Sequence, residues 1–419
     1  MSAIVHARCD HVLCRDTGRE PDDARRVPPR GVPRDLEHCV RHRDPALPHR
    51  ADGGIDRRPG GTRAADRGCR VSALIVAGPV GATTHDGGPQ HPERQARIGA
   101  VVEGIAALVH DGVEVISPPI VEAPLDALTR VHSPSYLAAL EGLCADGGGH
   151  IDADTYVRAD SWATARLAAG AGLVALDELD RRRGAAVAFV PVRPPGHHAL
   201  AGRAMGFCLL NNVAVAAASR TARGQRVLIV DWDVHHGNGT QSIFWDDPNV
   251  LYVSTHQHPL YPGTGGADEV GGTAAPGLTL NLPLPPGATG DVVRRALDEI
   301  ARPTIEAFSP DLVLVSCGFD AHRDDPLSNL DLESGDFAEL ARVVAEFAPA
   351  PGRLALFLEG GYDLEALRSS VVATLAALVG RRTGEAVRTS RGGPGLLQLR
   401  EADETRRRAV GLLQGDARR

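Results

Sequence analysis

The sequence contains no lysine, so all 45 of its basic side chains are arginine. Aromatic residues make up only 4% of the chain, and no apolar run is long enough to span a membrane. Seven cysteines occur at irregular spacing, which is typical of reduced thiols and argues against a disulfide framework. The first residues lack a hydrophobic signal segment, and we expect a cytoplasmic protein with no membrane partner.

Size and charge set broad limits on the kind of protein. At 419 residues with 43% hydrophobic content, the chain can bury a large core in one or two domains. Residues 71–419 carry 30 arginines against 42 acidic residues. An acidic surface repels a phosphate backbone, so nucleic acid is disfavoured as a partner and a cationic substrate is mildly favoured.

The first 70 residues differ in composition from the rest. They contain 15 arginines, 11 acidic residues and no aromatic residue, whereas every aromatic lies at or after Tyr136. Such a segment cannot bury enough apolar surface to offset the entropy lost on ordering. We predict that residues 1–70 are disordered or a non-native extension, that the natural protein starts near Val71, and that 71–419 form the functional domain with a helical tail. The alternative, a zinc knuckle of unusual spacing, would use Cys9, Cys14, Cys39 and His42.

From Val71 onward, apolar runs of strand length alternate with segments in which apolar residues recur every three or four positions. This order predicts a mostly parallel sheet covered on both faces by helices. Functional residues should then gather at the carboxyl ends of the strands. We expect strands at 73–76, 185–192, 227–230, 250–254, 278–284, 312–315 and 354–358, and helices at 161–179, 291–308, 334–347 and 364–379.

One predicted strand runs without a break into carboxylates and imidazoles. Period-two alternation places Asp231, Asp233 and His235 on one face, and Gly237 and Gly239 end the strand. Buried carboxylates need a cation or a hydrogen-bonded imidazole, and an aspartate with a histidine supplies ligands that zinc accepts. The stretch is a candidate metal site, the alternative being a salt-bridge cluster at the end of the strand.

Three further strand ends carry side chains capable of chemistry. His197 and His198 are adjacent on a turn that prolines and a glycine stiffen. Asp320 follows another strand and is a third candidate ligand, while Tyr362 follows two glycines that allow a sharp turn. The two histidines could be incidental residues of a surface loop, but four such signals on one sheet favour a shared active site.

These motifs resemble those of the zinc-dependent histone deacetylase superfamily, with its bacterial and class II members. The resemblance covers residues 71–380 and implies the arginase/deacetylase fold, a three-layer α/β/α sandwich with a mostly parallel central sheet. The matching stretches are His91-Pro-Glu93, Val131-His-Ser133, Asp154-Thr-Tyr156, Arg193 to Ala199, Gly206-Phe-Cys208, Asp231 to Gly237, Gly318-Phe-Asp320, Asp325-Pro-Leu327 and Glu359-Gly-Gly-Tyr362.

Position by position, the resemblance implies two cation sites. One zinc ion per chain would be held by Asp233, His235 and Asp320. A structural potassium ion would lie beside Asp231 and Ser254. With three protein ligands, zinc keeps positions for a water and for the substrate carbonyl.

The resemblance also implies the catalytic residues. His197 and His198 would take a proton from the water and return one to the leaving amine, while Tyr362 would donate a hydrogen bond to the oxyanion. Asp231 would orient His197, and Asn238 would stand behind the second histidine in the class II-like pattern. A neutral residue there should stabilise an imidazolium less than an aspartate would.

For the substrate, the resemblance implies an acyl-lysine tunnel at Gly206 and Phe207 with Tyr261, although either aromatic could be ordinary core packing. Leu327 stands after Asp-Pro, where polyamine-preferring members carry an acidic residue. We therefore expect acetyl-lysine in proteins or peptides rather than an acetylpolyamine or other small acetylated amine. Asp154 is on a loop that could supply an acidic group instead.

Other functions on this fold fit less well. A ureohydrolase would need further carboxylates for a binuclear manganese centre, and the run after His235 lacks them. A non-catalytic acyl-lysine-binding protein would be expected to lose Tyr362 or a ligand. We also consider a homo-oligomer.

Overall fold

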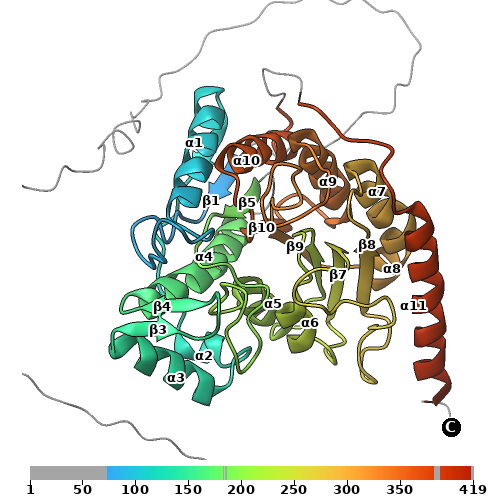
Figure 1. Ribbon diagram of the computed structural model, residues 1–419, viewed down its shortest axis with the longest axis horizontal. Coiled ribbons are helices and arrows are strands. Elements are labelled where there is room, and N and C mark those ends of the chain that lie inside the picture. Colours follow the sequence, from blue (N-terminus) through green and yellow to red (C-terminus); the bar gives the residue numbers. More distant parts are fainter. Residues whose placement is uncertain (1–72, 183, 185, 382–386, 417–419) are drawn as a thin grey trace, which may run out of the picture. The chain divides into compact units, whose positions relative to one another are not determined.

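The computed structural model describes residues 73–182, 184, 186–381 and 387–416 (Figure 1). The predictions for residues 1–70 and for a start near Val71 lie outside the described residues, as does residue 185 of the strand expected at 185–192. At the centre is an eight-stranded sheet in which all neighbouring strands are parallel. In order across the sheet, the strands are β2 (Glu114–Ile116), β1 (Ala73–Val76), β5 (Ala186–Val190), β10 (Leu354–Leu358), β9 (Leu312–Cys317), β6 (Val227–Asp231), β7 (Val250–Gln257) and β8 (Thr279–Leu284).

The seven expected strands are present, with small differences at their ends. β5 ends at Val190, before the expected residue 192, and β7 continues to Gln257. The edge strand β2 was not expected, because it has only three residues and none of them is fully buried. A separate antiparallel pair consists of β3 (Gly148–His150) and β4 (Tyr156–Arg158).

Helices cover both faces of the sheet because successive strand residues point to opposite sides. In β6, Leu228 and Val230 join one apolar layer, while Val227 and Ile229 join the other. The first layer is built with α1 (Ala96–His110), α7 (Gly290–Arg295), the π-helical segment η1 (Ala296–Ala301), α8 (Arg302–Phe308), α9 (Ser334–Phe347) and α10 (Leu364–Leu378). The second is built with α2 (Leu125–Leu128), α3 (Pro134–Ala145), α4 (Ser161–Arg182) and α5 (Asn212–Thr221).

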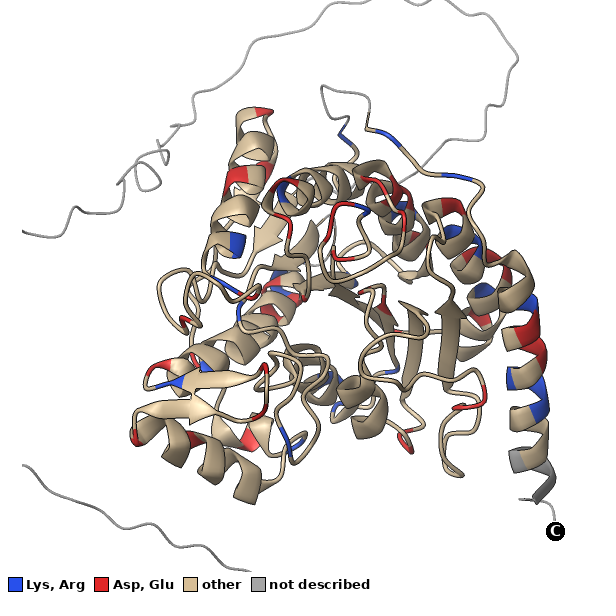
Figure 2. Cartoon of the chain, in the orientation of Figure 1, with Lys and Arg blue, Asp and Glu red and all other residues tan. Residues whose placement is uncertain are grey.

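Two more helices complete the fold. The short α6 (Asn238–Ile243) follows the loop after β6, and α11 (Leu396–Asp416) packs beside the edge strand β8 (Figure 1). Charged residues lie mainly on helices and loops, as the colours of Figure 2 show, which agrees with strands buried on both faces. Among the described helices, none combines the length and the apolar character needed to cross a membrane.

The strand order determines where the predicted motifs meet. β5, β10, β9 and β6 are four consecutive strands at the middle of the sheet. Because they are parallel, their carboxyl ends lie at the same edge. The loops that follow them carry the paired histidines, the tyrosine and the three candidate metal ligands, so the fold brings these segments together from widely separated parts of the sequence.

Candidate active site and metal centre

The chain turns sharply at the end of β6. The strand ends at Asp231, and side-chain acceptors then replace the sheet ladder: Asp233 N donates to Asp231 Oδ1 at 3.2 Å, and His235 N donates to Asp233 Oδ1 at 2.9 Å. The expectation that Gly237 and Gly239 end the strand is wrong, because these acceptors capture the backbone first. The two glycines instead permit close packing, since a Cβ on either would collide with the Asp231 carboxylate or with the histidine loop.

Asp233, His235 and Asp320 come together as a candidate metal centre. One ligand atom from each lies within 4.8 Å of the others. His235 Nδ1 is 3.2 Å from Asp233 Oδ1 and 3.2 Å from Asp320 Oδ2. Backbone donors hold the carboxylates in place, because Gly360 N donates to Asp233 Oδ2 at 2.8 Å and Val234 N donates to Asp320 Oδ1 at 2.9 Å.

The charge balance of this cluster suits a cation. Burial alone would lower the pKa of His235, but hydrogen bonds to Asp233 and Asp320 outweigh it and raise the pKa to about 10. A site that holds a proton so firmly between two carboxylates attracts a divalent cation for the same electrostatic reason. Among the described residues, the ion-pair partners of the three buried aspartates, counting Asp231, are the imidazoles of His197 and His235, so an ion-pair cluster without metal keeps a negative charge in the interior. One nitrogen and two oxygen donors also match the ligands of zinc.

The paired histidines lie on the loop after β5. Both are buried, at 3% and 4% exposed, so the alternative of incidental surface histidines does not hold. Their ring centres are 4.0 Å apart. His197 Nδ1 lies 3.1 Å from Asp231 Oδ2, whereas His198 Nδ1 lies 2.8 Å from Asn238 Oδ1. Each imidazole is therefore oriented by a different partner, one charged and one neutral.

Glu359 holds the histidine loop through hydrogen bonds to its backbone. Its Oε2 accepts hydrogen bonds from Gly196 N at 2.7 Å and His197 N at 3.1 Å, and Ser316 Oγ donates to its Oε1 at 3.2 Å. Burial raises the pKa of this carboxyl to about 7. Glu359 precedes the Gly-Gly-Tyr turn, and nothing in the local sequence indicates this supporting role. Its position links the β10 loop to the β5 loop.

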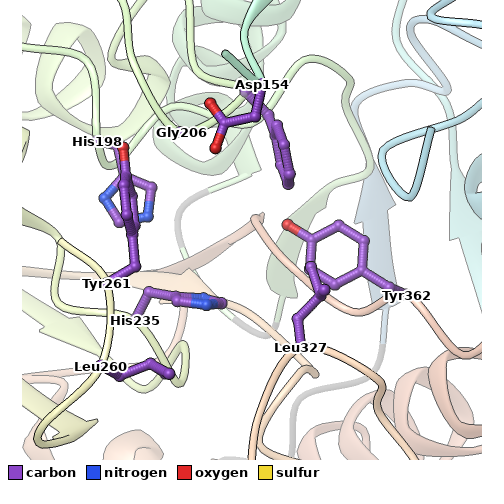
Figure 3. Close-up of a pocket in the computed structure, with 9 residues that line it drawn as sticks. Asp154, His198, Gly206, His235, Leu260, Tyr261, Leu327 and Tyr362 are labelled. Carbon is purple, nitrogen blue, oxygen red and sulfur yellow. The ribbon is translucent and has the colours of Figure 1, made fainter. Parts of the chain in front are cut away.

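A pocket of about 250 Å³ opens onto the centre. Figure 3 shows His198, His235 and Tyr362 pointing into it from three loops, with the tyrosine ring across the space from His235. His197 and Asn238 do not line the pocket but contact His198, and Asp231 contacts His197. The pocket is lined by Asp154, His198, Gly206, Phe207, His235, Leu260, Tyr261, Leu327 and Tyr362.

Two aromatic residues of the predicted tunnel line this pocket. Phe207 meets Tyr362 edge-on with ring centres 5.9 Å apart, and Tyr261 meets His198 edge-on at 5.2 Å. Tyr261 is 40% exposed, so it is not core packing. Gly206 has a φ of 55°, and a Cβ there would lie 2.6 Å from the His198 ring, which explains glycine at this position.

Some supporting residues were missed at the level of sequence. Arg97 Nε donates to the carbonyl oxygen of Gly361 at 2.6 Å, and its guanidinium carbon lies 4.9 Å from the centre of the Tyr362 ring. Asp325 Oδ2 accepts from Tyr362 N at 2.6 Å, and its Oδ1 accepts from Leu327 N at 3.0 Å. The motifs around Glu93 and Asp325 lie near these residues in the sequence, but nothing in the motifs indicates contact with the tyrosine loop.

Ser254 lies beside the last residue of β6. It pairs with Asp231 in the β6–β7 register, and both residues are fully buried. Ser254 Oγ lies 2.8 Å from His256 Nδ1. The two residues of the predicted potassium site are thus neighbours in the sheet.

A model of the histone deacetylase domain matches residues 91–378, well over half of the chain. The chain belongs to the histone deacetylase family. Histone deacetylase 10, chloroplastic, of Oryza sativa subsp. japonica is 42% identical over 311 residues, which are 69% of this chain and 70% of that protein. The histone deacetylase-like amidohydrolase of Pseudomonas aeruginosa is 38% identical over 303 residues, 71% of this chain and 78% of that protein. The crystal structure of the HDA15 HD domain matches with a TM-score of 0.73 and 34% identity, over 82% of this chain and 99% of that one.

Membership confirms the resemblance that the motifs indicated. This histone deacetylase family member has the predicted arginase/deacetylase fold, with a parallel central sheet between two helical layers. It is a hydrolytic enzyme of the deacetylase and amidohydrolase class, in which dependence on a metal is typical.

Proposed function

We propose that this histone deacetylase family member hydrolyses the N6-acetyl amide of lysine in proteins or peptides, using one zinc ion held by Asp233, His235 and Asp320. The main support for the proposal is that His235, a member of this cluster, lines one pocket together with His198 and Tyr362. An amide at the bottom of the pocket would face a cation, a base and a hydrogen-bond donor. When bound, zinc supplies a Lewis acid that acidifies water and polarises a carbonyl.

The two histidines would divide the proton transfers. His198 lines the pocket and is backed by the neutral amide of Asn238, which suits an imidazole that accepts a proton from the attacking water. His197 lies behind it against the Asp231 carboxylate, which suits an imidazole that carries positive charge near the developing oxyanion. The proton taken by His198 would then pass to the leaving amine.

Tyr362 would donate its hydroxyl hydrogen to the oxyanion. A single preorganised donor of this kind contributes roughly 3 kcal/mol to stabilisation of the transition state. Arg97 against the ring and Asp325 on the backbone N–H hold the tyrosine loop, so little rearrangement is needed during the reaction. The presence of the phenol argues for catalysis rather than for passive binding of an acyl-lysine.

The pocket walls suit an aliphatic stem. Phe207 and Tyr261 supply apolar ring surfaces, and Gly206 leaves room between these rings and His198. The four-carbon aliphatic stem of an acyl-lysine could therefore lie between the rings. At the rim, Leu327 would tolerate a neutral peptide backbone.

The proposal includes a structural potassium ion beside Asp231 and Ser254. The pairing of these two buried residues in adjacent strands supports it. A cation there would offset part of the negative charge of Asp231 beneath His197.

The second candidate is hydrolysis of an acetylpolyamine, and Asp154 favours it. This exposed residue lines the pocket, and Figure 3 shows its carboxylate at the pocket wall, where it could pair with a second ammonium group. A ureohydrolase is disfavoured, because the described residues contain a single three-residue group with metal-binding geometry. A cytoplasmic location and a homo-oligomer stay predictions.

One assay separates these functions. Acetyl-lysine peptides and acetylated polyamines are compared side by side as substrates of the purified protein, with and without a zinc chelator. We expect chelator-sensitive release of acetate with higher kcat/KM on peptides. Activity that survives removal of all metal would contradict the proposed mechanism.

A further inference from the structure

A second pocket, of about 200 Å³, lies beside the catalytic pocket at the β3–β4 pair. The two pockets share a wall formed by His91. Its ring meets Phe207 edge-on with ring centres 4.9 Å apart, and its Nε2 donates to the carbonyl oxygen of Asp154 at 3.0 Å. Phe207 and Asp154 both line the catalytic pocket. A substrate that extends out of the catalytic pocket past Asp154 therefore meets the second pocket on the far side of one imidazole.

The second pocket has basic side chains in its lining and no carboxylate. Arg158 Nε donates to the carbonyl oxygen of Asp86 at 2.9 Å, and no carboxylate within the described part of the chain forms an ion pair with its guanidinium. The imidazole of His150 likewise has no hydrogen-bond partner among the residues that are described. His91 Nδ1 lies 3.1 Å from Glu93 N and 3.0 Å from Glu93 O, so backbone contacts hold this imidazole in place as the wall.

Glycines keep this pocket open. Residues 147–149 are three consecutive glycines along its lining, and a Cβ on Gly147 would meet nothing within 4 Å. On another side, a Cβ at Gly87 would collide with the ring of Tyr156. Backbone, the phenol of Tyr156 and the imidazoles of His91 and His150 thus bound much of the space, with the guanidinium of Arg158 as its fixed charge.

We propose that this second pocket binds the carboxylate of an acidic residue that flanks the acylated lysine in a peptide substrate. The inference rests on the proposed acyl-lysine activity. A planar guanidinium matches a carboxylate in shape and can donate two parallel hydrogen bonds to it, and Arg158 has donors left for this purpose. The only carboxylate at the shared wall, Asp154, faces the catalytic pocket instead (Figure 3), so it does not occupy the guanidinium.

The expected gain in affinity is modest because Arg158 is exposed. An ion pair in such a position changes a dissociation constant by about threefold to fivefold and weakens as salt is added. The pocket therefore selects among peptide sequences, while the catalytic pocket supplies the main binding energy.

The test measures binding without turnover. Fluorescein-labelled pentapeptides carry a methyl ketone in place of the central acetamide, so they cannot be hydrolysed, and have either Glu or Gln at one flanking position at a time. Fluorescence anisotropy gives their dissociation constants for the metal-loaded wild type, for Arg158→Gln and for the control Arg130→Gln. Arg130 is an exposed arginine outside the pocket lining.

We expect tighter binding of a Glu peptide than of its Gln counterpart by wild type and by Arg130→Gln, and equal binding of the two by Arg158→Gln. Equal dissociation constants in the wild type at every flanking position, or a preference that survives in Arg158→Gln, overturn the inference. Turnover of the matching acetyl-lysine peptides is measured separately. Its absence would reject the proposed function, whereas a failed preference with normal turnover rejects the second pocket alone.

Discussion

The candidate site divides into two halves that differ in charge. Behind the pocket, His197 lies 3.1 Å from Asp231 and 3.8 Å from Asp233, whereas His198 faces the pocket and contacts the neutral Asn238. Burial alone lowers the pKa of both imidazoles. At His197 the carboxylates of Asp233 and Asp231 outweigh burial and raise the pKa, while at His198 the positive charge of His197 adds to burial and lowers the pKa further.

This difference shows that two adjacent residues of one type take their chemistry from the groups behind them. The loop after β5 positions the two imidazoles. Asp231 at the end of β6 and Asn238 at the start of α6 are the partners that influence the charge of these imidazoles. Negative charge is thereby concentrated around the candidate metal centre, whereas the imidazole of His198 on the pocket side has a lowered pKa. A neutral imidazole suits an adjoining aliphatic acyl-lysine stem better than a charged one.

The largest effect is expected from removing a ligand in the charged half. Asp320→Ala should abolish tight zinc binding and activity together, because two remaining ligands do not hold the ion. Metal content by atomic emission and acetate release are measured on the same preparation, with thermal unfolding to verify the fold. The control is Asp324→Ala, four residues further along the chain, where the side chain is 67% exposed. This variant should retain both zinc binding and activity. Full zinc stoichiometry in Asp320→Ala would refute the ligand assignment.

Tyr362→Phe tests the boundary between the halves. The variant should keep zinc, fold and KM but lower kcat by roughly 10²-fold or more, because a single oxyanion donor is lost. Steady-state kinetics and metal analysis are sufficient. An unchanged kcat would mean that Tyr362 contributes packing alone.

Asn238→Asp places a charge in the neutral half. A carboxylate beside His198 favours the imidazolium and raises the pKa of this histidine. Because a base must be unprotonated to accept a proton, activity should then be lost at a higher pH as the solution is acidified. The measurement is the acid limb of the profile of kcat/KM against pH. Below the pKa of the base, kcat/KM should fall about tenfold for each pH unit. Asn329→Asp, which changes an exposed amide, should leave the limb in place. A limb that does not move would show that His198 is not the base.

Much of the fold could be predicted because its central strands are buried on both faces. Such strands appear as continuous apolar runs, and the polar residues at their ends stand out. Nothing in the pattern of runs, however, specifies that β5, β10, β9 and β6 are consecutive in the sheet. The edge strand β2 could not be predicted, because it is short and partly exposed and therefore has no continuous apolar run.

The supporting residues could not be predicted, because their contacts are distant in sequence. Arg97 and Gly361 are 264 residues apart, and no local spacing connects an arginine on a helix to the backbone of a glycine turn. The same holds for Glu359, which supports a loop 162 residues earlier. The π-helical η1 within the helix expected at 291–308 is a local irregularity that periodicity alone does not detect.

The smallest expected effect concerns the rim of the neutral half, where Leu327 lines the pocket. An apolar side chain cannot pair with the second ammonium of an acetylpolyamine, and desolvating a cation beside it is unfavourable. Leu327→Glu should shift the ratio of kcat/KM values toward acetylspermidine by a factor of about ten, or about 1.4 kcal/mol. In the control Leu327→Gln, the side chain has nearly the shape of glutamate but no charge. This variant should leave the ratio of kcat/KM values close to that of wild type, which separates the effect of charge from that of size. Asp154 is the competing influence, because its exposed carboxylate lines the same pocket. If the wild type turns over an acetylpolyamine with a higher kcat/KM than any acetyl-lysine peptide, Asp154 rather than Leu327 decides the choice of substrate, and the neutral rim has no part in selection.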